Sequence, residues 1–230
     1  MSVATSSFAK TDWMERMILS LNPGQTVSIS DAAWDDYLTL CGTRDGGRPG
    51  IKICFANGRL LVVSPSFRHE KWTSRIGAMI ELLAEELGLP YEMARGTTFR
   101  QEELRAGLEA DECFYFANAP AIAARDEIDL ERDPPPDLAL EVDLTTDSTV
   151  KLDIYARIGV PEVWQFDGEA LLLRLLQTDG RYAATDRSPT FPMLNPASLV
   201  AFLNSVSHLD QGSMKRQARE WIKTLIGGRS

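Results

Sequence analysis

Short apolar runs flank the pair Asn57-Gly58 in the stretch IKICFANGRLLVVSP. Asparagine and glycine tolerate the left-handed backbone of a two-residue hairpin turn, so this stretch predicts two antiparallel strands. From residue 67 to 87 apolar residues instead recur every three or four positions, as on one face of a helix. This helical stripe consists of Trp72, Ile76, Met79, Ile80, Leu83 and Leu87. Gly88 and Pro90 predict the end of that helix.

A shorter helix is expected before the hairpin, with Ser30 as its N-cap and Gly42 as its stop. Its apolar face would hold Trp34, Tyr37, Leu38 and Cys41. The residues that precede it carry only a weak pattern. After the long helix, we expect two strands near 97–100 and 111–116, a loop over 119–136, and a short apolar strand over 138–142.

The second half of the chain continues with a helix that Asp147 or Ser148 would cap and Gly159 would end. The segment VPEVWQFD predicts a strand, and ALLLRLLQ with the turn Thr178-Asp179-Gly180 predicts a hairpin. Asn195-Pro196 is typical of a helix start. The stripe of the last helix consists of Met214, Ala218, Trp221, Ile222 and Leu225. This order of elements predicts an α/β (α+β) fold in which helices flank a mixed sheet.

Length and composition are those of a globular protein of one domain, residues 1–230, with 44% hydrophobic and 25% charged residues. No apolar run approaches the roughly 18 residues of a membrane span, and the N-terminus does not resemble a secretory signal. Cys41, Cys54 and Cys113 are odd in number and lack CxxC spacing, which favours buried free thiols in a reducing compartment. We therefore expect a cytoplasmic protein without a membrane partner.

The net charge of −9 argues against a passive nucleic-acid binder, which is normally basic. Between residues 101 and 147, fourteen Asp or Glu stand against three Arg, a net charge of −11. The rest of the chain is therefore about +2. An acidic centre of this kind repels phosphate unless cations neutralise it. Part of it, residues 126–133, is interpreted as a solvated acidic loop.

Glu141 stands in the middle of the apolar strand 138–142, where a carboxylate is costly to bury unless a partner compensates it. Side chains alternate along a strand, so Asp143 shares the face of Glu141 and lies about 7 Å from it. Glu141 has the alternative of a satisfied structural carboxylate. Asp143 has the alternative of a solvated residue at the strand end.

Asp111 begins the apolar segment DECFYF, and a short acid beside Glu141 would give two oxygen donors for a hard cation. Mg²⁺ (or Mn²⁺) favours such oxygen ligands, completed by water. The sequence alone does not make the two strands neighbours; it only allows their pairing through the intervening loop.

Lys151 shares a helical face with Ile154, Tyr155 and Ile158, which lie three, four and seven residues further on. A lysine on the stripe that faces the core is not placed like a solvent lysine. Its ammonium would orient the attacking water or stabilise phosphate charge. The alternative is that the side chain extends from the helix end into solvent.

His69 and Glu70 open the long helix. His69 lies at the edge of the apolar stripe, which fits a site residue as well as a hydrogen-bonded histidine at the core edge. Glu70 lies nearly opposite the stripe and favours the helix N-terminus through the helix dipole alone.

Four segments carry a resemblance: NGRLLVVSPSFRHEKW, EADECFYF, PPPDLALEVDLTTDS and KLDIYARIGVPEVWQFD. The chain resembles the Uma-type restriction endonuclease family of the PD-(D/E)XK nuclease superfamily. The resemblance covers about residues 50–167. It implies a restriction-endonuclease-like core, with the N-terminal helix and the C-terminal helical segment as additions, and a Mg²⁺-type site.

The same resemblance makes Asp111 and Glu141 the metal-binding acids, and Glu70 and His69 the residues at the start of the long helix. The superfamily lysine two positions after the acid would be residue 143, which is Asp here. The resemblance implies that Lys151, from the following helix, replaces it.

These observations together predict a Mg²⁺-dependent endonuclease that acts on DNA, with Asp111, Glu141, Lys151, His69 and Glu70 as site residues. The alternative is a catalytically silent binding or regulatory module of nuclease fold, which the acidic middle segment favours. A third alternative is a structural homo-oligomer, such as a homodimer, that pairs through Trp221 and the stripe of the last helix.

Overall fold

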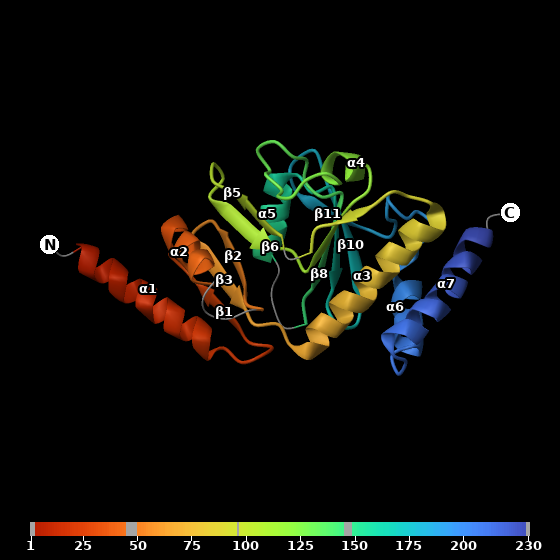
Figure 1. The fold of residues 1–230 in the computed structure, drawn as a ribbon, viewed down its shortest axis with the longest axis horizontal. Coiled ribbons are helices and arrows are strands. Elements are labelled where there is room, and N and C mark those ends of the chain that lie inside the picture. Colours follow the sequence, from red (N-terminus) through yellow and green to blue (C-terminus); the bar gives the residue numbers. More distant parts are fainter. Residues whose placement is uncertain (1–2, 45–49, 96, 145–148, 229–230) are drawn as a thin grey trace.

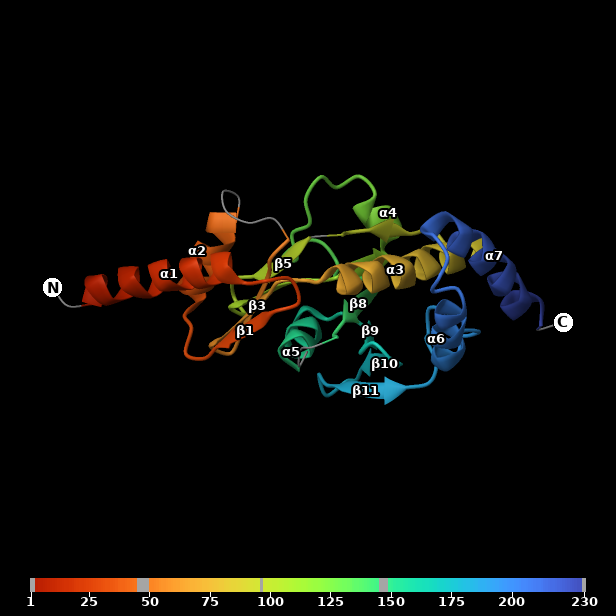
Figure 2. The same ribbon diagram turned by 90° about the horizontal axis from the view of Figure 1, so that it is seen from below.

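The computed structural model describes residues 3–44, 50–95, 97–144 and 149–228. Two sheets lie side by side along an elongated molecule, with helices on their outer faces and one helix between them (Figures 1 and 2). The predicted α/β class with a mixed sheet and flanking helices is confirmed, and its strands are divided between two sheets.

The first sheet has five antiparallel strands in the order β1-β3-β2-β6-β5. These strands are β1 (Thr26–Ile29), β2 (Lys52–Ala56), β3 (Arg59–Val63), β5 (Thr98–Gln101) and β6 (Ala106–Glu109). Helices α1 (Val3–Ser20) and α2 (Trp34–Arg44) contribute Met14, Trp34 and Tyr37 to the core that they form with β2 and β3. These helices lie at the N-terminal end of the molecule (Figure 1).

The second sheet has six strands in the order β11-β10-β9-β8-β7-β4. They are β4 (Glu92–Met93), β7 (Glu112–Tyr115), β8 (Leu138–Val142), β9 (Glu162–Phe166), β10 (Leu171–Leu176) and β11 (Tyr182–Thr185). β8 and β9 pair in parallel and the other pairs are antiparallel, so this sheet is mixed. One face of β8, with Leu138, Leu140 and Val142, packs under α3 (Phe67–Leu87), α6 (Pro196–Ser205) and α7 (Gln211–Gly227).

Helix α5 (Thr149–Ile158) connects the parallel strands β8 and β9 and lies between the two sheets (Figure 2). Its residues Val150, Ile154 and Tyr155 share a core with Cys54 of β2 and Ala139 of β8. A crossover between parallel strands needs a long connection, usually a helix, and here that helix also joins one sheet to the other. The position of α5 therefore places its side chains beside both β2 and β8.

The local predictions with a clear backbone reason are confirmed. Asn57 and Gly58 have φ values of 53° and 73°, as a two-residue hairpin turn with both central residues left-handed requires. Gly88 caps α3 with a φ of 66°, and Asn195 caps α6 by accepting from the Ser198 N–H. The cysteines are free thiols, with Cys54 and Cys113 buried. The proposed caps Asp147 and Ser148 lie outside the described residues.

Four predictions about where elements begin and end, or how many a segment contains, are wrong. Helix α2 begins at Trp34. The side chain of Asp36, inside the first turn, accepts a hydrogen bond from the Ala33 N–H just before the helix, so Ser30 is not its N-cap. Gly42 lies inside α2, which continues to Arg44. Between α3 and residue 117 the chain forms four strands, β4 to β7, where two were expected. The weakly patterned N-terminus, for which no element was predicted, forms α1 and β1. The expected loop over 119–136 contains the short helix α4 (Ala119–Ile122).

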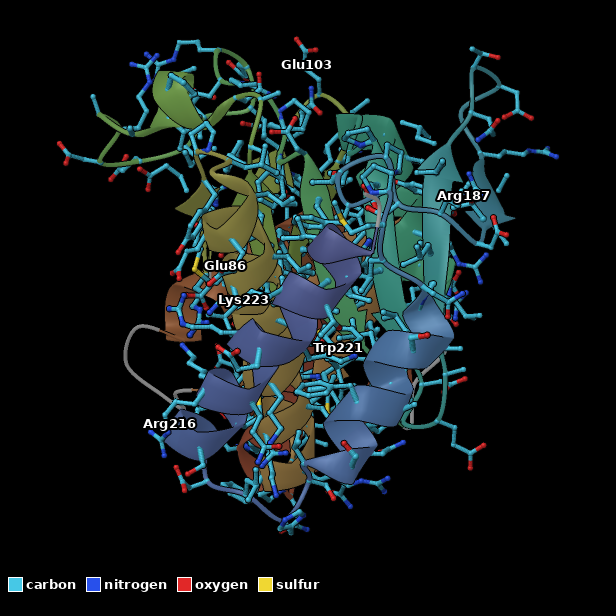
Figure 3. The ribbon with its side chains drawn as sticks, turned by 90° about the vertical axis from the view of Figure 1, so that its right-hand side faces the viewer. Glu86, Glu103, Arg187, Arg216, Trp221 and Lys223 are labelled. Carbon is cyan, nitrogen blue, oxygen red and sulfur yellow. The ribbon has the colours of Figure 1, made fainter. Side chains whose placement is uncertain are left out.

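The apolar stripe of α7 packs within its own chain (Figure 3). Met214, Ala218 and Ile222 are buried, and Trp221 stacks on Phe202 of α6 with ring centroids 4.8 Å apart. Arg219 extends the contact to α3 by pairing with two glutamates of that helix. The stripe therefore packs mainly against α3 and α6 of its own chain, and pairing of two copies through Trp221 stays a prediction. Within the described part of the chain, no helix is long and apolar enough to cross a membrane.

A close approach of α2 to the first sheet gives a test of the fold. A Cβ on Gly107 would lie 2.2 Å from the Tyr37 hydroxyl oxygen, so Gly107→Ala forces α2 or β6 to move. We expect this variant to lower the free energy of unfolding by about 1–3 kcal/mol, the usual cost of overpacking. Gly42→Ala is the matched control, because its added Cβ meets no atom within 4 Å in α2. This control should gain about 0.5–1 kcal/mol from helix propensity. Urea unfolding of both variants measures whether each substitution lowers or raises the free energy of unfolding.

Candidate active site

The antiparallel pairing of β7 and β8 aligns two acidic residues. Glu112 pairs with Leu140 and Cys113 with Ala139, so the same register sets Asp111 opposite Glu141. Side chains that lie directly opposite in an antiparallel pair share a face and approach to about 5 Å at their Cβ atoms. Both carboxylates are buried, with 0% and 1% of their side chains exposed. The structure thus supplies the adjacency that the sequence left open.

Glu141 receives both of its contacts from α5. Lys151 donates to Oε2 and the Tyr155 hydroxyl donates to Oε1, and both donors are buried. They stand four residues apart and so lie on one face of the helix. The Lys151 side chain is 4% exposed, so the alternative in which it extends into solvent is wrong. Glu141 is compensated by a cation and a hydroxyl from a single helix.

Asp111 has partners from three other elements. Lys52, the first residue of β2, places its Nζ 2.5 Å from Oδ1. His69 in the first turn of α3 lies with its Nε2 3.0 Å from Oδ2, and the Val142 backbone N–H donates to the same oxygen at 2.7 Å. These partners bring the first strand of the hairpin, the start of the long helix and the end of β8 to one carboxylate.

The pKa shifts follow from this mixture of burial and charge. Burial alone would raise the pKa of Asp111, but Lys151, Lys52 and His69 outweigh it and hold that pKa well below its usual range. Burial alone would lower the pKa of Lys151, but Glu141 and Asp111 hold it well above its usual value. Burial raises the pKa of Glu141, with Lys151 opposing the shift. Lys151 is therefore a charged hydrogen-bond donor in this site.

His69 joins the buried acids to the helix terminus. Its side chain is 10% exposed, and its Nδ1 lies 3.3 Å from Oε1 of Glu70, which is 56% exposed. Burial would lower the pKa of His69, but contacts with Asp111 and Glu70 raise it to about 9. Glu70 thus reaches the site only through His69. Ser66 caps this helix by accepting from the His69 N–H, which fixes the first turn.

Asp143 lies near the lysine and not in bulk water. Its Oδ1 is 4.0 Å from the Lys151 Nζ, and its side chain is 10% exposed. The solvated alternative for Asp143 is therefore wrong. Asp143 and Lys151, with His69, also line a cavity of about 30 Å³ between the end of β3 and the end of β8. That volume suits a single water-sized group beside the lysine.

The family of the chain is shown by a match over most of its length. The sequence model of the Uma2 family, described as "Putative restriction endonuclease", matches residues 34–206. The chain belongs to the Uma2 family. The match begins with α2, ends just after α6, and contains every residue of the cluster described above. No curated protein matched the chain.

Uma2 membership brings a nuclease family and the restriction-endonuclease-like fold, a class that usually works with divalent metal ions. The donor chemistry of Asp111 and Glu141 fits such an ion, because both supply hard oxygens side by side. The ammonium groups of Lys52 and Lys151 already lie on these oxygens, so this position attracts cations. Among the described residues, no group of three or more His, Cys, Asp or Glu is arranged to hold a metal. The chain would therefore supply two carboxylates and leave the remaining positions to water.

Sequence reasoning missed two members of this Uma2 cluster. Lys52 precedes the apolar run of β2 and looks like an ordinary residue at a strand start, with no periodicity to mark it. Tyr155 was noted only as an apolar member of the α5 stripe. Its position four residues after Lys151 was the available signal, since both side chains had to reach the same region.

The hydroxyl of Tyr155 gives a test of how this buried carboxylate is held. Tyr155→Phe removes the donor to Glu141 Oε1 and leaves that buried oxygen without it, so we expect a loss of about 1–3 kcal/mol in unfolding free energy. Tyr91→Phe is the control, because the Tyr91 hydroxyl donates to Glu85 at the exposed surface at 3.3 Å. The control should change stability by less than about 0.5 kcal/mol. Equal losses in the two variants, measured by urea unfolding, would contradict the importance of this contact.

Proposed function

We propose that this Uma2 protein is a divalent-cation-dependent endonuclease that hydrolyses DNA phosphodiester bonds. The observation that carries the proposal is the buried contact of Lys151 with Glu141, opposite Asp111 across the β7–β8 pair. A lysine and two acids that converge from separate elements at one edge of a sheet supply what phosphodiester hydrolysis needs. Those needs are a place for a cation, a positive donor for phosphate and a nearby position for water.

Asp111 and Glu141 are the residues that would hold Mg²⁺ (or Mn²⁺). When bound, the ion supplies Lewis acidity, which lowers the pKa of a water and neutralises charge on phosphate. His69 and the Val142 N–H fix the carboxylate of Asp111 from two sides. Glu70 acts on the site through His69 and does not touch the acids directly.

Lys151 is the residue that we assign to the reacting phosphate and its water. Its ammonium borders the cavity that His69 and Asp143 also line, so a water there would lie beside a fixed positive donor. The raised pKa of Lys151 favours the role of a charged donor over that of a general base. Lys151 therefore orients the nucleophile and stabilises negative charge.

The proposed substrate approaches the site along the start of α3. Phe67 is 83% exposed and Arg68 is exposed beside it, two residues and one residue before His69. The Arg68 guanidinium lies near Gly168 in the turn between β9 and β10. An exposed aromatic ring stacks on bases, and arginine pairs with phosphate. These two side chains are the contacts that would hold a nucleic acid next to the site.

The decisive experiment is nicking of supercoiled plasmid in Mg²⁺ or Mn²⁺. Lys151→Met should lower the rate about 100-fold or more, because it removes the charge that stabilises the transition state. Asp111→Asn should lower both the rate and Mn²⁺ binding. Lys223→Met is the matched control, since Lys223 lies 55% exposed on α7 and pairs only locally with Glu220.

Circular dichroism and unfolding curves must accompany these rates, because loss of Lys151 leaves Glu141 buried without its cation. Equal nicking by the wild type and Lys151→Met overturns the assignment of Lys151. Absence of nicking in every divalent ion, with metal binding retained, favours the binding or regulatory module. The net charge of −11 over residues 101–147 is the observation on which that second function rests.

The proposed approach along α3 can be tested separately from the chemistry. Phe67→Ala and Arg68→Ala should each raise the DNA concentration needed for half-maximal nicking, and should leave the rate at saturation within about threefold. Both side chains are exposed, so unfolding free energy should stay within about 0.5 kcal/mol of the wild type. A loss confined to the saturating rate would contradict a role in substrate binding.

A further inference from the structure

Lys52 is the cation closest to Asp111, and neither the strand pattern nor the family resemblance gave it a role. Its Nζ lies 2.5 Å from Asp111 Oδ1. The other oxygen, Oδ2, takes the His69 ring and the Val142 N–H, which belong to a helix turn and to the backbone of a strand. Oδ1 is therefore held by a long, flexible side chain, whereas Oδ2 is held by rigid elements.

The two lysines of the cluster differ in their freedom to move. Lys151 is 4% exposed and lies between Glu141 and Asp143. Lys52 is 15% exposed and reaches inward from the end of β2. A lysine ammonium on four flexible methylenes can turn toward solvent where part of the side chain is already exposed. Lys52 is thus the ammonium that is able to leave the site.

Because the cluster is buried, its charge favours the departure of one ammonium group when a divalent cation binds to Asp111 and Glu141. Each lysine is paired with one carboxylate, so a dication that entered with both pairs intact would raise the buried charge of the cluster by about +2. The same oxygen also cannot accept both the ammonium and a metal ion along one direction. Departure of Lys52 frees Asp111 Oδ1 and lowers this excess charge from about +2 to about +1, while Lys151 stays in place.

We propose that Lys52 is the exchangeable cation of the site: it competes with the divalent ion for Asp111 Oδ1, and turns to the substrate phosphate once the ion is bound. The inference rests on the proposed metal-dependent function. It goes beyond that function by predicting that the free protein resists the ion, and that phosphate, by attracting Lys52, makes metal binding tighter.

Isothermal titration of the full chain with Mn²⁺ tests the competition. Lys52→Met keeps the length of the side chain and removes its charge, so it should bind Mn²⁺ roughly tenfold more tightly than the wild type. Lys52→Arg keeps the charge and should show no tightening, and Lys223→Met should match the wild type. A Lys52→Met protein that binds Mn²⁺ equally or more weakly overturns the proposal.

Amine labelling of the wild-type protein gives a measurement that does not depend on a variant folding. Acetylation of Lys52 by an N-hydroxysuccinimide ester, read by mass spectrometry, should rise several-fold when Mn²⁺ is added. Lys71, exposed on α3, is the internal control and should react equally in both conditions. Unchanged labelling of Lys52 at saturating Mn²⁺ contradicts its departure from Asp111.

The outcomes for this inference and for the nuclease function are separable. Tighter Mn²⁺ binding by Lys52→Met together with absence of nicking supports the exchangeable cation and overturns the nuclease. Nicking by the wild type without tightening in Lys52→Met supports the nuclease and overturns the exchange. Absence of Mn²⁺ binding in every protein overturns both.

Discussion

Two carboxylates buried opposite each other in one sheet are the constraint on which the rest of this structure depends. Asp111 and Glu141 could not remain ionised in the interior without partners, and no single element supplies enough of them. Lys52 comes from the first sheet, His69 from α3, and Lys151 with Tyr155 from α5. Compensation of these charges therefore requires that both sheets and both helices occupy their places together. Removing any one cation would leave a buried charge that the remaining apolar surroundings cannot screen.

The charged cluster contributes more to the positions of the surrounding helices than to the free energy of folding. A buried ion pair is often no more stabilising than an apolar pair of the same shape. The apolar cores above and below the second sheet account for the packing, with Leu140 on one face of β8 and Ala139 on the other. The charged cluster instead fixes where α5 sits between the sheets and where α3 begins. The proposed hydrolysis would need that precision to position a reacting phosphate.

Features with a local physical cause were predictable from the sequence. The Asn57-Gly58 hairpin, the α3 stripe that Gly88 ends, and the cap at Asn195 each follow from backbone preferences of a few residues. Glu141 and Lys151 could be singled out because each breaks an apolar pattern. The pairing of Asp111 with Glu141 could not be predicted, because it depends on a register set across a connection of more than twenty residues. The role of Lys52 could not be predicted from the sequence for the same reason, since its partner Asp111 lies 59 residues away. The start of α2 was misplaced because Asp36, inside the helix, replaces the cap expected at Ser30.

Lys151 reaches Glu141 from a helix, and the position two residues after Glu141 on the strand is Asp143. The charged end of a lysine can therefore keep its place in space while its backbone moves to another element. A search that demands acid and lysine on one strand, at fixed spacing, would pass over this chain. A search that looks for a lysine in register with the apolar face of the crossover helix would find it. The chemistry proposed for this site needs an ammonium group at one location, and more than one element of a fold can deliver it.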